Sequence, residues 1–269
     1  MSGFSADWLA LREPYDLRAR DPLVRDAVSA AFAGYPSLRV VDLACGTGAT
    51  LRALAPHLPA HQYWRLADND LSLLARASAA PCPQGVTVNA VPLDLSRDLE
   101  AALDGPVDLI TASALLDLVS QDWLERLAVE TAARAIPLYA ALSYDGRIEF
   151  DPVDAADATV VAAVNAHQRT DKGFGRALGP AAASAAIARF ETLGYSVVHG
   201  KSDWIIGPHD RDIQSELLAG WASAGREIGE LSLADAVGWL TRRRDAVAAG
   251  RSSIRVGHVD FFAWPTATR

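Results

Sequence analysis

A glycine-containing loop after an apolar run is the feature of the sequence that most clearly carries chemistry. The β-branched residues from Val40 onward predict a strand that ends at Leu43, just before the loop. Glycine has no Cβ, so Gly46 and Gly48 would let the backbone pass close to a ligand. Asp42 lies just before the loop and would favour a positive charge nearby. The loop therefore predicts a binding site for a small cationic molecule.

The spacing of the loop disfavours two other classes of ligand. A dinucleotide fingerprint has a third glycine three residues after the second, where this sequence has Leu51. A phosphate-binding P-loop has a lysine after its last glycine, and here Ala49 follows Gly48. S-adenosylmethionine (SAM) carries a sulfonium and an ammonium, and these charges suit an acidic residue at the loop better than a pyrophosphate does.

Strands and helices are predicted to alternate around this loop. The predicted strands cover residues 38–43, 63–67, 86–91, 107–112, 137–144, 195–198 and 255–264. Helical segments separate most of them, so we expect an α/β fold whose Rossmann-like, seven-stranded, mostly parallel sheet has helices on both faces. Such a sheet binds ligands beyond the carboxyl ends of its strands, where the glycine loop would lie.

We expect the whole chain, residues 1–269, to form one domain. A helical segment over residues 1–36 would precede a ligand-binding core over residues 37–145. Residues 146–180 and 205–250 interrupt the alternation with further helical patterns. We interpret both stretches as helical insertions that form a cap over the substrate.

The run from Val41 to Gly48 resembles the glycine-rich first motif of class I SAM-dependent methyltransferases. Ala44 stands where many members have a further glycine. The resemblance covers residues 36–145 well and the final strands loosely. It implies that the chain binds SAM, releases S-adenosylhomocysteine (SAH), and methylates an O or N atom of a small molecule.

The resemblance also implies which residues hold the cofactor. Asp68 stands where the family holds the ribose hydroxyls, and a carboxylate has two oxygens that suit a vicinal diol. Asn69 stands where the adenine packs, Asp94 and Leu95 where the adenine amino group is met, and Ser113 where the methionine part lies. With the N-terminal candidates below, the predicted cofactor-binding residues are Asp42, Ala44, Cys45, Gly46, Gly48, Asp68, Asn69, Asp94, Leu95, Ser113, Tyr15 and Arg20.

The segment from Leu11 to Arg20 resembles the region that precedes the sheet in small-molecule methyltransferases. In that region a Tyr or Arg often closes over SAM. The resemblance implies that Arg20 or Arg12 meets the SAM carboxylate and that Tyr15 packs on the sulfonium side.

Methyl transfer depends mainly on placing the nucleophile against the methyl group, and a general base is optional. We expect Asp117, Tyr144 and His167 to face the substrate. Each has a structural alternative: Asp117 could cap the helix that contains Trp123, Tyr144 could lie in the core, and His167 could be a buried structural histidine on an apolar helix face.

Residues 169–179 contain three glycines around Lys172 and Phe174. Glycines lower the cost of a change in backbone conformation, so we expect this stretch to be a lid from which Arg169 or Lys172 reaches the substrate. The alternative is an ordinary connector.

The composition of the chain disfavours several classes of partner, location and site. The formal net charge of −8 argues against a nucleic-acid partner, because phosphate contacts need a surplus of Lys and Arg. No apolar run reaches the ~20 residues of a membrane helix, and the N-terminus does not resemble a secretory signal, so we expect a cytoplasmic monomer or homodimer. Cys45 and Cys82 are the only cysteines, and neither a disulfide framework nor a metal site is expected.

Three other function classes remain open. One is an aminopropyltransferase built on the same fold, although no acidic polyamine motif is recognisable. Another is a SAM- or SAH-binding module without catalysis. The third is a Rossmann-type NAD-dependent oxidoreductase, because an acidic residue about 20 positions after the glycines also occurs in that class.

Overall fold

A sheet of eight strands runs through the computed structural model, which describes residues 4–266. The strands are β1 (Leu38–Leu43), β2 (Gln62–Asp68), β3 (Val86–Pro92), β4 (Leu109–Ser113), β5 (Leu138–Asp151), β6 (Tyr195–Lys201), β7 (Trp204–Ile206) and β8 (Ser253–Pro265). Their order is β3-β2-β1-β4-β5-β8-β6, and β7 pairs with β8 beside this path. The first five strands are parallel, and β8 is antiparallel to β5, β6 and β7.

The predicted seven-strand, mostly parallel sheet is confirmed, and β7 is an additional short strand. Strand β5 continues seven residues past the predicted end at Tyr144. In this extension Ile148 and Phe150 are buried, while Glu149 and Asp151 are exposed. This alternation is typical of a strand with one buried face. Gly146 interrupts the apolar pattern and accompanies an irregularity in the β5–β8 register, which hid the extension from sequence reasoning.

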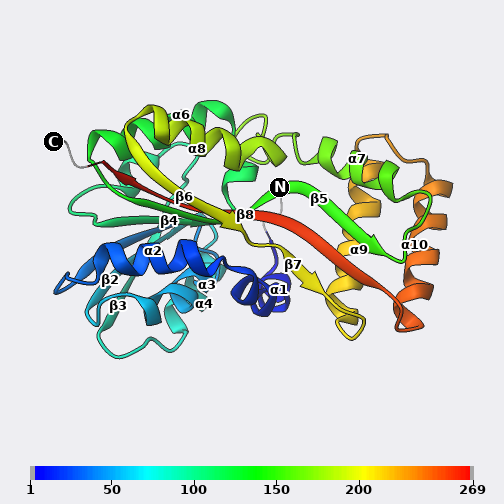
Figure 1. Cartoon of the computed structure of the whole chain (residues 1–269), viewed down its shortest axis with the longest axis horizontal. Helices are drawn as coiled ribbons and strands as arrows, with labels where there is room; N and C mark the ends of the chain where they lie inside the picture. The colour runs from blue at the N-terminus through cyan, green and yellow to red at the C-terminus, as the bar shows by residue number, and fades with distance from the viewer. Residues whose placement is uncertain (1–3, 267–269) are drawn as a thin grey trace.

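Helices cover both faces of the sheet (Figure 1). The helices are α1 (Ala6–Ala19), α2 (Pro22–Phe32), α3 (Ala49–Leu54), α4 (Leu71–Ala79), α5 (Leu99–Ala102), α6 (Gln121–Ala133), α7 (Asp157–His167), α8 (Ala182–Thr192), α9 (Arg211–Glu227) and α10 (Leu233–Ala248). One apolar core joins the sheet to α5, α6 and α8, and a second joins its other face to α2, α3 and α4.

Polar side chains fix where several helices begin. Asp21, Asp70, Ser120 and Ser232 each accept a hydrogen bond from a backbone N–H in the first turn of α2, α4, α6 and α10, respectively. Such caps satisfy N–H groups that have no partner within the helix. The cap of α6 is Ser120, so the alternative that Asp117 caps this helix is wrong.

The extended ends of β5 and β8 run beyond the rest of the sheet into a lobe formed by α7, α9 and α10 (Figure 1). This lobe has its own apolar core, which includes Ile148, Phe150, Trp204 and Trp239. Helix α1 lies between the lobe and the parallel part of the sheet. Among the described residues, no helix is long and apolar enough to span a membrane.

Candidate functional site

The glycine loop joins β1 to α3 at the carboxyl edge of the sheet. Its backbone takes positive φ at Ala44 (52°), Gly46 (53°) and Gly48 (82°). Glycine adopts this region without strain, which explains the two glycines. The loop is anchored to the neighbouring strand, since the Cys45 N–H donates to the Ala67 carbonyl over 3.1 Å. The loop therefore forms a fixed turn directly above β1 and β2.

Asp68, the last residue of β2, points at this loop. Its two carboxylate oxygens accept from the backbone N–H groups of Gly46 (2.8 Å) and Asp70 (3.0 Å). A carboxylate has about four lone-pair sites, so both oxygens keep acceptor capacity for a ligand hydroxyl. Asn69 follows on the surface and is exposed. The structure thus brings the predicted ribose and adenine residues of β2 next to the glycine loop.

Asp42 is fully buried at the base of the loop. Its Oδ1 accepts from the Thr111 hydroxyl over 2.7 Å, and its Oδ2 has no hydrogen-bond partner among the described residues. Burial raises the pKa of Asp42 to about 7, against the opposing effects of the Thr111 hydrogen bond and the Arg20 charge. An unpaired buried carboxylate oxygen is costly, and a cationic group placed beside it would remove that cost.

Arg20 reaches the same edge from the end of α1. Its guanidinium donates to Ser113 Oγ and to the Tyr139 hydroxyl, each over 3.2 Å, and its Nε has no partner. Asp260 lies near the Tyr139 hydroxyl, and its carboxylate accepts from the backbone N–H groups of Leu142 (2.7 Å) and Asp21 (3.0 Å). The structure therefore brings Arg20 and Ser113 together and leaves the Arg20 Nε–H without a partner among the described residues.

The third strand-end carboxylate, Asp94, follows β3. Its Oδ1 accepts from the N–H and the hydroxyl of Ser96, and these hydrogen bonds hold the pKa of Asp94 below its usual range. Leu95 is buried in the core, and its carbonyl accepts from the Trp123 indole over 2.6 Å. Because the Leu95 side chain packs in the core, only the backbone of this residue is available for a contact with adenine.

Helix α1 covers the glycine loop with one face. A Cβ on Gly46 would come within 3.2 Å of Leu9, and Glu13 forms an ion pair with Arg52 of α3 at 2.5 Å. The hollow between α1 and α3 has a volume of about 40 Å³. Its lining residues are Glu13, Asp16, Leu17, Arg20, Ala49, Arg52 and Ala53.

The other face of α1 carries Tyr15, which packs against the core of the lobe with Trp8 and Leu11. The Tyr15 hydroxyl donates to Asp210 over 2.8 Å, before the first turn of α9. Residues 8, 11 and 15 follow the i, i+3, i+7 spacing of one helix face, opposite the face that covers the loop. In this structure Tyr15 therefore faces Asp210 and the lobe, and its packing on the sulfonium side stays a prediction.

Asp117 and Tyr144 lie together where β4 and the parallel part of β5 end. Asp117 is only 5% exposed in the short turn Leu116–Leu118, and its Oδ1 has no hydrogen-bond partner among the described residues. Burial raises the pKa of Asp117 to about 6, while the Tyr144 N–H and the charges of Arg12 and Lys172 oppose the rise. The Tyr144 hydroxyl donates to Asn165 of α7 over 2.8 Å. Asp117 is thus the unsatisfied acceptor of this pair.

His167 links three elements. Its Nδ1 accepts from the Lys172 ammonium (3.2 Å) and its Nε2 lies 3.3 Å from Glu227 of α9. With both ring nitrogens engaged, the structure favours the structural alternative for His167 over a catalytic one. Burial lowers the pKa of Lys172, whose charge still influences Asp117. Arg169 is exposed and donates to the Asn165 carbonyl.

The loop over residues 169–179 packs on the carboxyl edge of the sheet. The Leu178 N–H donates to the Val119 carbonyl over 2.8 Å, and the ring of Phe174 lies 5.4 Å from that of Trp123 in an edge-to-face arrangement. Gly175 lies beside Ser120, since a Cβ built on it would be in ordinary contact with the Ser120 side chain at 3.5 Å. The loop therefore lies next to Asp117, where a lid would have to lie.

His258 of β8 is a buried residue of this region that the sequence analysis did not select. Its ring lies 6.2 Å from that of Tyr144 and 5.0 Å from that of Trp204. Burial lowers the pKa of His258 to about 3, so the ring is neutral. The available signal was a His and an Asp at alternate positions, His258 and Asp260, within an otherwise apolar strand.

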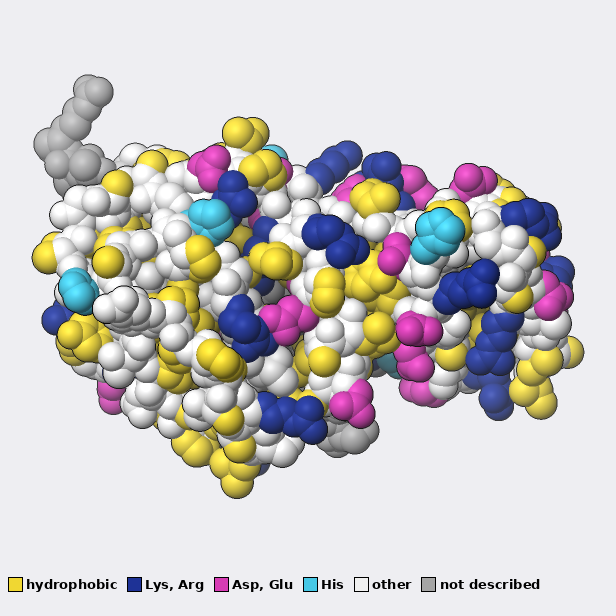
Figure 2. Space-filling view, turned by 90° about the horizontal axis from the view of Figure 1, so that it is seen from below, with side chains coloured by type: hydrophobic (Ala, Val, Ile, Leu, Met, Phe, Trp, Pro, Cys, Tyr) yellow, Lys and Arg dark blue, Asp and Glu magenta, His cyan; other side chains and the backbone are white. Residues whose placement is uncertain are grey.

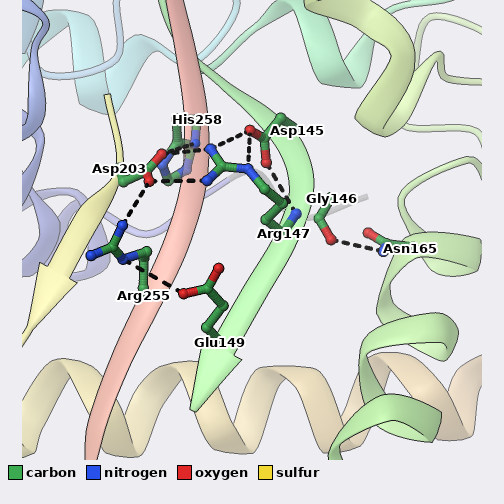
Figure 3. A network of polar contacts seen from close by, with 8 residues as sticks. All are labelled: Asp145, Gly146, Arg147, Glu149, Asn165, Asp203, Arg255 and His258. Atoms are coloured by element: carbon green, nitrogen blue, oxygen red, sulfur yellow. Dashed lines mark hydrogen bonds and ion pairs between the residues drawn. The ribbon is translucent and has the colours of Figure 1, made fainter. Parts of the chain in front are cut away.

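A network of charges holds the strands that carry these rings (Figure 3). Arg147 of β5 donates to Asp145 (2.5 Å) and to Asp203 (2.7 Å), and the His258 N–H donates to Asp203 (3.3 Å). A Cβ at position 257 would lie 2.2 Å from Asp145, which explains why a glycine precedes His258. Because Asp203 precedes Trp204, this network fixes Trp204 and His258 relative to Tyr144.

The surface shows no segregation of charge on the face in Figure 2. Lys and Arg side chains lie among Asp and Glu side chains on both the sheet half and the helical lobe. Over residues 4–266, no three His, Cys, Asp or Glu side chains come together as a metal site would require.

The chain is similar to known proteins in part of its sequence and in its fold. Residues 40–136 match the family described as a methyltransferase domain. The chain is similar to a cyclopropane-fatty-acyl-phospholipid synthase-like protein from Lactobacillus casei, with 15% identity and a TM-score of 0.55 over 98% of this chain and 96% of the other. It is also similar to the YcgJ protein from Bacillus subtilis, with 15% identity and a TM-score of 0.51 over 92% of this chain and 100% of the other. No sequence among the curated proteins matches the chain.

Proposed function

We propose that this chain transfers a methyl group from SAM to an oxygen or nitrogen atom of a small molecule, without a metal ion, and the match of residues 40–136 to a methyltransferase domain supports this proposal. One observation carries the cofactor part of this proposal. Asp42, Asp68 and Arg20 converge on the glycine loop, and two of them keep buried polar atoms without partners. SAM offers an ammonium, a carboxylate and a vicinal diol, which complement an acid, an Arg and a second acid.

The residues of the site fit SAM group by group. Asp42 Oδ2 would pair with the ammonium, and the free Arg20 Nε–H with the carboxylate. Asp68 would accept from the ribose hydroxyls, beside an adenine that Asn69 and Asp94 meet. When bound, SAM supplies a methyl group on a positively charged sulfur, which is open to attack by a lone pair. The protein's part is then to orient the acceptor and exclude water.

Helix α1 must move for the cofactor to enter. Pockets for ligands of this size have volumes of ~300 Å³ or more, whereas the hollow under α1 holds about 40 Å³. The Glu13–Arg52 ion pair and the contact of Leu9 with the glycine loop would break as SAM enters. We therefore assign α1 the role of a cofactor lid.

The acceptor would enter between α1 and the helical lobe. Asp117 and Tyr144 line this side, and Lys172 approaches from the loop over residues 169–179. In this proposal the helices over residues 146–180 and 205–250 form the cap of a single domain. Asp117 is the group best placed to accept a hydrogen bond or a proton from the acceptor, because its Oδ1 has no other partner.

Incubation with methyl-labelled SAM and a fractionated cell extract tests this function. We expect label in extract components of low molecular mass, and loss of that transfer in Asp68→Ala, with Asp98→Ala, an exposed acid outside the site, as the matched control. Label only in the macromolecular fraction, or equal transfer by both variants, would contradict the proposal.

A further inference from the structure

Arg12 of α1 lies in a cation site formed by Trp204 of β7 and by Asp16 of the same helix. Its guanidinium carbon lies 5.0 Å from the centre of the Trp204 ring, within the range of a cation–π interaction. Asp16 accepts from the same guanidinium (2.9 and 3.1 Å) and from the Trp204 indole N–H (3.0 Å). All three side chains are buried.

Further groups of this site face Arg12 from the sheet. The ring of His258 lies beside Trp204, and Tyr144 lies beside His258. The Arg12 charge lowers the pKa values of both Asp117 and His258, so it acts on both side chains. The Oδ1 of Asp117 is buried and has no hydrogen-bond partner among the described residues. The Arg12 guanidinium therefore lies over the Trp204 ring, pairs with Asp16, and acts electrostatically on Asp117 and His258.

The site remains suited to a cation when Arg12 leaves it. Arg12 and Asp16 both belong to α1, so they move together when this helix opens. Trp204, His258, Tyr144 and Asp117 stay on the sheet side. Arg147 is already held between Asp145 and Asp203 (Figure 3), and Lys172 is held by His167. The ring of Trp204 then loses its guanidinium partner, and the carboxyl group of Asp117 stays buried on the sheet side.

We propose that this is the acceptor site, that the acceptor is a cationic amine, and that Arg12 takes the place of the amine when α1 is closed. This rests on the proposed methyl-transfer function and narrows it to nitrogen. The ammonium of the acceptor packs on Trp204 and pairs with Asp117, as the guanidinium of Arg12 does on Trp204 and Asp16. His258 is a neutral wall and does not repel the ammonium.

The chemistry of the step balances within these groups. The ammonium first gives one proton to the Asp117 carboxylate, which leaves a lone pair on nitrogen. That lone pair attacks the methyl carbon of SAM, the carbon–sulfur bond breaks, and SAH leaves with the bonding electrons. The products are a protonated N-methylamine, SAH and a protonated Asp117, which returns its proton to water.

The test uses the full-length protein loaded with SAH and three probes of one shape: benzylamine, benzyl alcohol and benzoate at pH 7. Calorimetry should show benzylamine, which is cationic, binding at least tenfold more tightly than the neutral and anionic probes. Arg12→Met keeps the apolar stem but frees the Trp204 face, so it should raise benzylamine affinity about tenfold, the scale of a cation–π contact combined with a charge pair. Asp117→Asn should lower it by a similar factor.

Arg18→Met is the matched control, because Arg18 lies over the Tyr15 ring (4.5 Å) of the same helix but on the exposed surface. It should leave benzylamine affinity unchanged. The SAH affinity of each variant reports folding and the cofactor site independently, so failure to bind SAH would count against the proposed function instead. Equal binding of the three probes, absence of benzylamine binding at millimolar concentrations, or an Arg12→Met variant that binds benzylamine no better than wild type would overturn the inference.

Discussion

Replacement of Asp42 by Asn probes the buried acid at the base of the glycine loop. Burial raises the pKa of Asp42 from 3.8 to about 7 in the folded chain. In the unfolded chain the carboxyl group ionises with an ordinary pKa, so between these two values the unfolded state releases a proton that the native state keeps. The stability that Asp42 contributes is therefore fully present below its unfolded pKa and is lost as the pH rises through about 7.

The size of this effect follows from the shift. One pKa unit corresponds to about 1.4 kcal/mol, so the full shift corresponds to roughly 4 kcal/mol. Between pH 5 and pH 8, the range that is practical to measure, the loss attributable to Asp42 is about 2–3 kcal/mol. Asn cannot ionise, and it keeps an oxygen for the Thr111 hydroxyl. The variant should therefore lose this share of the pH dependence, while Asp117 keeps its own share.

Urea denaturation of the SAM-free protein at pH 5 and pH 8 measures the effect. Wild type should be less stable at pH 8, and the difference between the two pH values should shrink by about 2–3 kcal/mol in Asp42→Asn. Asp94→Asn is the control, because the pKa of Asp94 is lowered and its loss cannot reduce a slope of this sign. An unchanged slope in Asp42→Asn would show that the carboxyl group is not held protonated by burial, and would refute the reasoning.

The other predictions concern the cofactor, the cap and the helix that covers the site. Asp68→Ala should weaken SAM binding roughly 10- to 100-fold in calorimetry, and unchanged SAM affinity would make Asp68 purely structural. Because the Gly46 and Asp70 N–H groups also lose their acceptor, urea denaturation should show the SAM-free variant destabilised by about 1–3 kcal/mol. Lys172→Ala should impair methyl transfer while its SAM affinity stays nearly intact, and full activity of this variant would make the loop over residues 169–179 a connector. In the wild-type protein, hydrogen exchange of this loop should slow when SAM and the acceptor are both bound. Glu13→Gln removes the ion pair with Arg52 and should speed SAH association several-fold in stopped-flow fluorescence; an unchanged rate would show that α1 does not gate entry.

The cofactor side was predictable from the sequence because its residues follow strands in a regular way. Parallel strands place their carboxyl ends at one edge, so Asp42, Asp68 and Ser113 had to converge once the strands were recognised. Local hydrogen bonds could not be predicted. The structure shows that Asp68 already serves two backbone N–H groups, and that Asp94 binds Ser96.

The acceptor side was less predictable because it depends on contacts between distant segments. Arg12, Trp204 and His258 meet only because α1 lies against β7 and the extended end of β8, and no local pattern encodes that packing. Tyr15 illustrates the same limit. The resemblance of the segment from Leu11 to Arg20 implied a cofactor contact, but the helical period turns Tyr15 toward Asp210 and the lobe in this structure.

Calorimetric titration of the purified chain with SAM, SAH, NAD and ATP tests the central claim most directly. The convergence of Asp42, Asp68 and Arg20 on the glycine loop predicts that SAM and SAH bind, and that NAD and ATP bind far more weakly. Tight binding of NAD with no response to SAM or SAH would contradict the account.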